Sequence, residues 1–304
     1  MIYLRAFTLP EAEQESAFAM GILRKCYNDF YPFQVLPAKG ISRVEFAPIT
    51  IFCGGNGSGK STLLNVIAEK LGVRRDSLYN RSSFFEDYLA LCEADTCVTG
   101  PMNRCITTSD GVFDVMLNLR AVNQGIDRRR EQMFEEYLEA KYSQFQMRSM
   151  EDYQTLRHIN ETRRKTQSRY VREHLGGNVR EHSNGESALL YFQDKVTENG
   201  LFLLDEPENS LSPQKQRELC RFLEEAARFY NCQLIIATHS PFLLAMRGAR
   251  IYDMDASPAR TVKWTDVPNV RAYFDFFKEH QGEFGSFFSG NIGASPCQRQ
   301  KDVL

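Results

Sequence analysis

The stretch that decides the fold reads Ile49-Thr50-Ile51-Phe52-Cys53-Gly54-Gly55-Asn56-Gly57-Ser58-Gly59-Lys60-Ser61-Thr62. Its first part is a short apolar run rich in β-forming residues, and this run ends directly in glycines. From Lys60 onward the apolar residues recur at helical spacing, with Leu63, Leu64 and Ile67 on one face. The spacing G-x-x-x-x-G-K-S between a predicted buried strand and a predicted helix indicates a loop that binds nucleotide phosphates.

Each part of this loop has an expected task. Glycines let the backbone curl so that several N–H groups point at the phosphates, and the following helix adds the positive end of its dipole. We expect Lys60 to face solvent until it meets the β and γ phosphates, and the Ser61 hydroxyl to bind Mg²⁺. The predicted ATP-binding residues are Gly54, Gly55, Asn56, Gly57, Ser58, Gly59, Lys60, Ser61 and Thr62.

Two later apolar runs, Leu201–Leu204 and Leu234–Ala237, also end in polar residues and are predicted to be central parallel strands. Ligands of parallel sheets bind at the carboxyl ends of the strands. Asp205 is therefore predicted to hold Mg²⁺, and Glu206 to orient or deprotonate the attacking water. His239 can contact a γ-phosphate, although a lone histidine there is more often a satisfied polar strand end. Glu206 and His239 are the predicted catalytic residues.

A fourth motif, Ser183-Asn184-Gly185-Glu186, precedes a predicted helix. A serine and a glycine at a helix N-terminus can form a second anion site. The same residues also fit a capping box, because Glu186 follows a small polar residue at three positions' distance. Taken singly, the motif favours the cap.

The order of the four motifs resembles that of the ABC-type ATPases: phosphate loop, signature motif, acidic strand and switch histidine. The resemblance is closest to the soluble SMC/RecF-like branch and its short, armless bacterial "AAA family" members. It implies an α/β P-loop NTPase fold with a mainly parallel sheet, in which residues 1–304 form a single ABC-type ATPase domain. A helical subdomain at about 112–182 would be inserted between the phosphate loop and the signature motif.

The resemblance further implies an ATP-hydrolysing enzyme that needs ATP and Mg²⁺ and forms an ATP-dependent homodimer, an ATP-gated switch. Ser183, Asn184, Gly185 and Glu186 of one subunit would act in trans on the γ-phosphate bound by the other. One departure concerns the glutamine that the family places after the strand leading into the insert. The predicted strand 104–108 is followed by Ser109-Asp110 instead. Tyr31 and Phe33 are candidates for stacking on adenine, with core packing as their alternative.

Composition sets the remaining limits. The chain has 304 residues and a net charge of -2, and no run of 18 apolar residues predicts a membrane span. We read no signal peptide and expect a cytoplasmic protein. The polar stretch 157–180 is basic, so nucleic acid is one possible partner and a second protein is another. Two alternatives stay open: the nucleotide-binding subunit of a membrane transporter, and an ATP-dependent nucleic-acid-binding protein of repair or phage defence.

Overall fold

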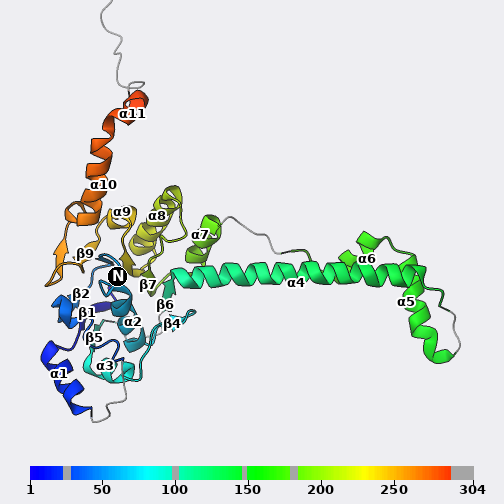
Figure 1. The fold of residues 1–304 in the computed structure, drawn as a ribbon, viewed down its shortest axis with the longest axis horizontal. Helices are drawn as coiled ribbons and strands as arrows, with labels where there is room; N and C mark the ends of the chain where they lie inside the picture. The colour runs from blue at the N-terminus through cyan, green and yellow to red at the C-terminus, as the bar shows by residue number, and fades with distance from the viewer. Residues whose placement is uncertain (23–28, 98–102, 146–148, 179–183, 289–304) are drawn as a thin grey trace, which may run out of the picture.

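The computed structural model describes residues 1–22, 29–97, 103–145, 149–178 and 184–288, and its centre is a mainly parallel sheet (Figure 1). The strand order is β10-β9-β3-β8-β7-β6-β4. Neighbouring strands are parallel except at one edge, where β10 pairs antiparallel with β9. The strands are β3 (Ile49–Cys53), β4 (Arg74–Arg75), β6 (Asn103–Thr108), β7 (Gly200–Asp205), β8 (Gln233–Thr238), β9 (Arg250–Asp253) and β10 (Arg260–Val262).

Helices cover both faces of this sheet, which explains why the run Leu201–Leu204 of the central strand β7 is apolar. In β7, Leu201 and Leu203 pack into the core that contains α2 (Lys60–Lys70) and α3 (Phe85–Leu91). Phe202 and Leu204 pack into the opposite core, which contains α7 (Asn184–Lys195), α8 (Pro213–Phe229) and α9 (Pro241–Leu244). Alternate side chains of a strand point to opposite faces, so a strand buried on both sides favours apolar residues at successive positions.

A smaller antiparallel sheet, in the order β2-β1-β5, lies beside the N-terminal helix α1 (Ala12–Gly21). Gln233, at the start of β8, ties the two sheets together. Its buried amide oxygen accepts hydrogen bonds from the backbone N–H groups of Tyr3 and Leu4, and its amide nitrogen donates to the Leu4 carbonyl. The strands are β1 (Leu4–Thr8), β2 (Arg43–Glu45) and β5 (Glu93–Thr96), and a short 3-10 turn, η1, spans Pro37–Lys39.

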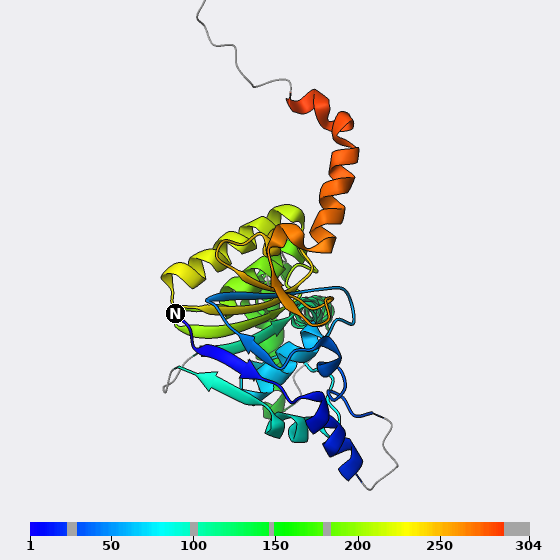
Figure 2. The same cartoon turned by 90° about the vertical axis from the view of Figure 1, so that its left-hand side faces the viewer.

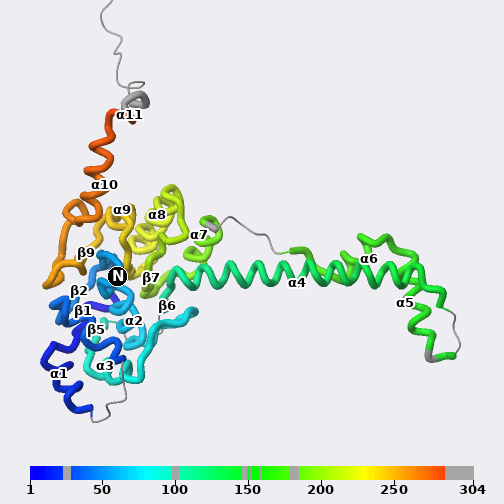
Figure 3. Tube along the Cα trace, viewed as in Figure 1, coloured from blue at the N-terminus to red at the C-terminus, as the bar shows by residue number. Residues whose placement is uncertain are grey.

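An arm projects from the sheet at β6. Its main helix, α4 (Ser109–Tyr142), has 34 residues and is therefore about 50 Å long. The helices α5 (Tyr153–Arg163) and α6 (Gln167–His174) lie at its far end (Figure 3). Tyr137 and Tyr170 form a small separate core there, and the Tyr137 hydroxyl donates a 2.9 Å hydrogen bond to the Lys165 carbonyl. The predicted helical insert thus contains one long helix with a packed tip.

The C-terminal helices α10 (Pro268–Glu279) and α11 (Gln281–Phe288) project from the other side of the sheet, after the turn η3 (Trp264–Asp266) (Figure 2). Val270 is buried at the base of α10, whereas the aromatic side chains further along are about half exposed. Across the described ranges, no helix combines the length and the apolar character that crossing a bilayer requires.

Candidate functional site

The phosphate loop connects β3 to α2 as the sequence predicts, and glycines occupy its unusual backbone positions. Gly54, Gly57 and Gly59 have φ values of 152°, 78° and 92°, which side chains with a Cβ rarely adopt. Ser58 is buried, and Asn56 lines the cavity next to the loop. Gly55 donates its backbone N–H to Asp255 at 2.8 Å, so the turn after β9 also holds the loop.

Lys60 does not face solvent, which corrects the prediction. The side chain is 4% exposed, and its ammonium group donates to the carbonyl oxygens of Gly54 at 2.8 Å and Gly55 at 2.9 Å. The physical reason is that the curled loop turns these carbonyls inward, where the ammonium group is the donor within reach. Lys60 therefore stabilises the loop that it is predicted to use for phosphate binding.

Ser61 and Asp205 meet at the carboxyl end of the sheet. The Ser61 hydroxyl donates to Oδ1 of Asp205 at 3.0 Å. Burial raises the pKa of Asp205 to about 6; the hydrogen bond from Ser61 and the charge of Lys60 oppose the rise, and the charges of Glu206 and Glu208 add to it. Asp205 still ionises near neutral pH, so it is a carboxylate that a cation would stabilise further.

Glu206 follows directly and has a left-handed backbone, with φ of 48°. Such a conformation is uncommon for a non-glycine residue and marks a sharp turn out of the strand. The carboxylate lies 3.8 Å from the Lys60 ammonium group and 4.0 Å from Nδ1 of His239. Asn209 donates to its second oxygen at 2.9 Å. The structure thus brings together residues from three parallel strand ends, β3, β7 and β8.

Glu208 is a residue of this cluster that the sequence reasoning missed. Its side chain is 4% exposed, and Oε1 accepts hydrogen bonds from the Thr238 hydroxyl at 2.6 Å and the His239 backbone N–H at 2.9 Å. The same oxygen lies 3.3 Å from Nδ1 of His239. The carboxylate therefore fixes the end of β8 and borders the histidine ring. Nothing in the local sequence distinguishes it from a solvated acid of the loop.

The predicted signature motif is described only in part. Ser183 lies outside the described residues, and Asn184 opens α7. Glu186 is in the first turn of this helix. At Gly185, a Cβ atom would come within 3.4 Å of the Ser210 carbonyl, so this helix start packs closely on the loop after the acidic strand. α7 packs against α8, α4 and β6 rather than beside α2 and the phosphate loop.

Two further positions were left open by the sequence. Ser109 and Asp110 stand where the family has its glutamine. The Ser109 hydroxyl accepts a 3.4 Å hydrogen bond from the Asn209 side chain, whereas Asp110 is exposed. Phe33 stacks on Phe18 at 4.6 Å between ring centroids and is a core residue. Tyr31 is half-buried, and its hydroxyl donates to Thr62 at 3.2 Å, so it lies beside α2.

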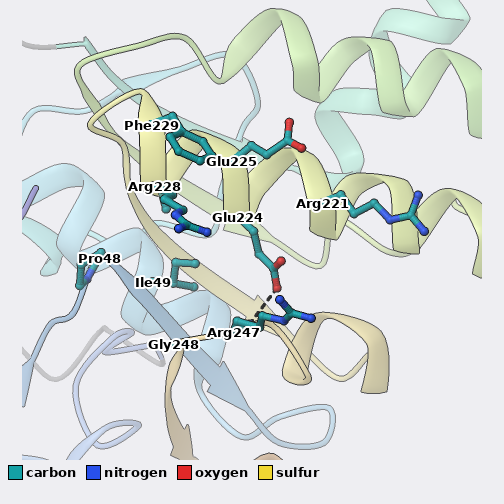
Figure 4. Close-up of a pocket in the computed structure, with 10 residues that line it drawn as sticks. Pro48, Ile49, Arg221, Glu224, Glu225, Arg228, Phe229, Arg247 and Gly248 are labelled. Atoms are coloured by element: carbon teal, nitrogen blue, oxygen red, sulfur yellow. Dashed lines mark hydrogen bonds between the residues drawn. The ribbon is translucent and has the colours of Figure 1, made fainter.

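A cavity of about 590 Å³ opens at this cluster. Gly54, Gly55 and Asn56 line one side, and Glu206 and His239 line another. A second cavity, of about 490 Å³, lies at the amino end of β3, where Arg228 and Arg247 surround Ile49 (Figure 4). Parallel sheets bind ligands at the carboxyl ends of their strands, and the first cavity is the one at that end.

Comparison with known protein families matches part of the chain. Residues 150–245 match the family described as "AAA domain, putative AbiEii toxin, Type IV TA system". The matched range contains the acidic strand β7 and the histidine strand β8. Together with the phosphate loop, the match confirms the predicted resemblance: the chain is similar to ABC- and SMC-like P-loop ATPases. No curated protein matches it.

The solved structures with similar chains include an ABC transporter and two SMC head domains, at low similarity. An inward-facing metal-chelate-type ABC transporter is 19% identical with a TM-score of 0.35, covering 77% of this chain and 80% of that one. The Smc head domain of Pyrococcus furiosus, bound to the C-terminal domain of ScpA, is 11% identical with a TM-score of 0.41, covering 92% and 100%. The SMC head domain of Thermotoga maritima is 13% identical with a TM-score of 0.36, covering 86% and 99%. Similarity of this degree assigns no activity.

Proposed function

We propose that the chain binds ATP with Mg²⁺, hydrolyses it, and acts as an ATP-gated dimeric switch. The observation that carries the proposal is a set of contacts beside one cavity: Glu206 and His239 line it, Lys60 lies 3.8 Å from Glu206, and the Ser61 hydroxyl donates to the adjacent Asp205 at 3.0 Å. These are the groups that phosphoryl transfer to water requires: donors for the phosphate oxygens, a metal-binding hydroxyl and carboxylate, and a base for the water.

The residues present fit Mg²⁺. The Ser61 hydroxyl and the Asp205 carboxylate are oxygen donors 3.0 Å apart, and Mg²⁺ is usually bound through one or two protein oxygens together with phosphates and water. When bound, Mg²⁺ neutralises charge on the phosphates. Glu206 then accepts a proton from the attacking water, because its carboxylate lies at the cavity wall beside Lys60. His239 contacts the γ-phosphate, and Lys60 reaches the β and γ oxygens.

The dimeric part of the proposal rests on α7. The signature helix packs against α8, on a different side of the sheet from α2. Its N-terminus would therefore meet a γ-phosphate that a second copy of the chain holds. Ser183 and Gly185 would close the site in trans, in an arrangement that repeats by two-fold symmetry. ATP would favour the dimer by mass action, and hydrolysis would release it.

Sedimentation of the Glu206→Gln protein, with and without Mg-ATP, tests the switch. The variant keeps the shape of the site but lacks the base, so it should bind ATP and hydrolyse it far more slowly. With Mg-ATP it should therefore accumulate as a dimer. Adding Ser183→Arg should block that dimer while leaving ATP binding by the monomer intact. A dimer of equal strength without ATP, or one indifferent to Ser183→Arg, would overturn the proposal. Undiminished turnover in Glu206→Gln would refute the role of the base.

A second candidate role comes from the description of the matched family, which names a toxin of a type IV toxin–antitoxin system. If the chain acts as such a toxin, its expression should slow growth in a way that needs the nucleotide site. Growth curves of cells expressing the wild type or Lys60→Ala test this. Equal growth inhibition by both proteins would separate toxicity from ATP.

The structure gives less support to nucleic-acid binding by the basic stretch 157–180. Arg157 pairs with Glu161, and Lys165 and Arg169 both pair with Glu173. Arg163 donates to the carbonyl oxygens of Lys141 and Ser143. Among the described residues of this stretch, these four cations are thus paired within the arm, and a cation that is already paired is less available for phosphate contacts.

A further inference from the structure

One peptide unit of the phosphate loop, the one that joins Gly54 to Gly55, is held from both sides by charged side chains. Its carbonyl oxygen accepts a 2.8 Å hydrogen bond from the Lys60 ammonium group. Its N–H group donates a 2.8 Å hydrogen bond to Oδ2 of Asp255. The C=O and N–H groups of a planar trans peptide point in opposite directions, so the two charges lie on opposite sides of it. Each bond polarises the peptide in the sense that strengthens the other.

The turn that follows β9 places the Asp255 carboxylate beside the loop. β9 runs parallel to β3, with Asp253 opposite Cys53. The Met254 N–H donates to the Cys53 carbonyl at 2.8 Å. The buried Asp253 side chain then accepts the Asp255 N–H at Oδ1, at 3.0 Å. These bonds fix the backbone of Asp255 relative to the start of the phosphate loop.

Gly54 shows how closely the carboxylate approaches the loop. A Cβ atom at Gly54 would lie 2.9 Å from Oγ of Ser58 and 3.1 Å from Oδ1 of Asp255, which is closer than most Cβ contacts. Its φ of 152° also favours glycine. The lack of a side chain at this position therefore lets the Asp255 carboxylate reach the next N–H group of the loop.

The held peptide in turn orients the ammonium group of Lys60. An ammonium group has three N–H donors. Two of them go to the carbonyl oxygens of Gly54 at 2.8 Å and Gly55 at 2.9 Å. The remaining contact, to the Ser58 hydroxyl at 3.5 Å, is at the outer limit of a hydrogen bond. The third donor is therefore the one that can turn to a phosphate oxygen, while the two loop bonds fix the direction of the group.

We propose that Asp255 is a positioning residue for phosphate binding, which acts on Lys60 through the peptide between Gly54 and Gly55. This role rests on the proposed ATP-binding function. Without the carboxylate, the peptide can rotate easily because both of its residues are glycines. A rotated peptide turns its carbonyl away from Lys60, and the ammonium group then loses one of the two bonds that direct it. A donor that is already directed binds more tightly, because less ordering is needed when the ligand arrives.

Calorimetric titration of the full chain with Mg-ATP tests this role. Asp255→Ala should weaken ATP binding about three- to tenfold, because the Gly55 N–H loses its acceptor. Asp255→Asn keeps an acceptor oxygen but removes the negative charge, so it should bind ATP at least as tightly as the wild type. The matched control is Asp152→Ala, which should bind ATP like the wild type. The Asp152 carboxylate also accepts a backbone N–H, that of Ser149 at 3.1 Å, but it does so in the arm.

Urea unfolding without nucleotide tests the connection to Lys60 separately. Asp255 and Lys60 hold the same peptide, so the double variant Asp255→Ala with Lys60→Ala should lose less stability than the sum of the two single losses. Lys70 donates instead to the Leu89 carbonyl. The losses of Asp255→Ala and Lys70→Ala should therefore add. Losses that add in both pairs would show that Asp255 does not act through the peptide that Lys60 holds.

Two results of the titration would overturn the positioning role. One is an Asp255→Ala variant that binds ATP as tightly as the wild type, or more tightly because the carboxylate had repelled the phosphates. The other is an Asp255→Asn variant that binds no better than Asp255→Ala. A wild type that binds no ATP would refute the proposed function together with this role. A wild type that binds ATP, with equal affinity in Asp255→Ala, would refute this role alone.

Discussion

The Ser61 hydroxyl donates a 3.0 Å hydrogen bond to Oδ1 of Asp205, and this bond joins the first turn of α2 to the carboxyl end of β7. It places an alcohol and a carboxylate side by side at the edge where a parallel sheet binds ligands. Burial raises the pKa of Asp205 to about 6, so this carboxyl group becomes protonated only slightly below neutral pH.

The first prediction is that the affinity for Mg-ATP falls as the pH drops below 6. Asp205 must be ionised to hold a metal, and protons compete with the metal once the pH passes below the raised pKa. The loss should approach about tenfold per pH unit. Titrations with Mg-ATP between pH 5 and 8 measure it. Asp205→Asn is the control, because its profile lacks the titration of Asp205; identical profiles would contradict the assignment.

Asp205→Asn should also stabilise the fold at pH 7. The pKa of Asp205 is raised above its ordinary 3.8, so the folded state loses stability as the pH rises through the range from about 4 to about 6. Removing the charge while keeping an acceptor for Ser61 should recover up to about 3 kcal/mol. Urea unfolding should show a much smaller gain at pH 4, where the carboxyl group is protonated in the folded state and is only about half ionised in the unfolded state. A variant less stable than the wild type at pH 7 would refute this account.

Lys60→Ala should lose tight ATP binding and also lose stability. The ammonium group donates to the carbonyls of Gly54 and Gly55, and its removal leaves them unpaired, at about 1–3 kcal/mol. Lys70→Ala is a matched control on the same helix, since Lys70 donates to the Leu89 carbonyl at 2.8 Å, away from the loop. It should lose stability but keep ATP binding. Lys60→Ala with full ATP affinity would show that the loop does not bind phosphate through this residue.

Sequence reasoning succeeded where the information is local. A short run of residues specifies each of the elements predicted correctly: the strand, loop and helix around Lys60, the strand that ends at Asp205 and the strand just before His239. It failed where distant groups meet. The bond between Gly55 and Asp255 spans 200 positions, and the approach of Glu208 to Thr238 spans 30. No local pattern specifies such contacts, because the sheet order decides them.

The burial of Lys60 and the length of α4 were missed for different reasons. Lysine is rarely buried, and the composition of the loop does not indicate that the loop carbonyls turn toward the Lys60 side chain. The continuous helix α4 is difficult to predict from the sequence, because it buries few of its residues and the helical spacing of its apolar residues is therefore weak. Only the tip core around Tyr137 has a clear helical pattern.

The last prediction concerns the pair formed by Glu208 and His239. One carboxylate oxygen accepts the His239 backbone N–H and lies 3.3 Å from the ring nitrogen Nδ1, so we expect Glu208 to orient the ring for the proposed contact with a γ-phosphate. Glu208→Gln keeps an acceptor for the backbone but cannot hold the ring in the same way. We expect kcat to fall about 10- to 100-fold, with KM for ATP nearly unchanged.

A double-mutant cycle distinguishes this positioning role from general destabilisation. If Glu208 acts through the histidine, Glu208→Gln should have no further effect on kcat in a His239→Ala background. Glu224→Gln is the control: Glu224 also accepts a backbone N–H, that of Arg247 at 2.8 Å, but it lies at the opposite cavity. Its turnover should match the wild type. Two losses that multiply in the double variant would show that Glu208 acts independently of His239, since a residue that works only by orienting the ring has nothing left to orient.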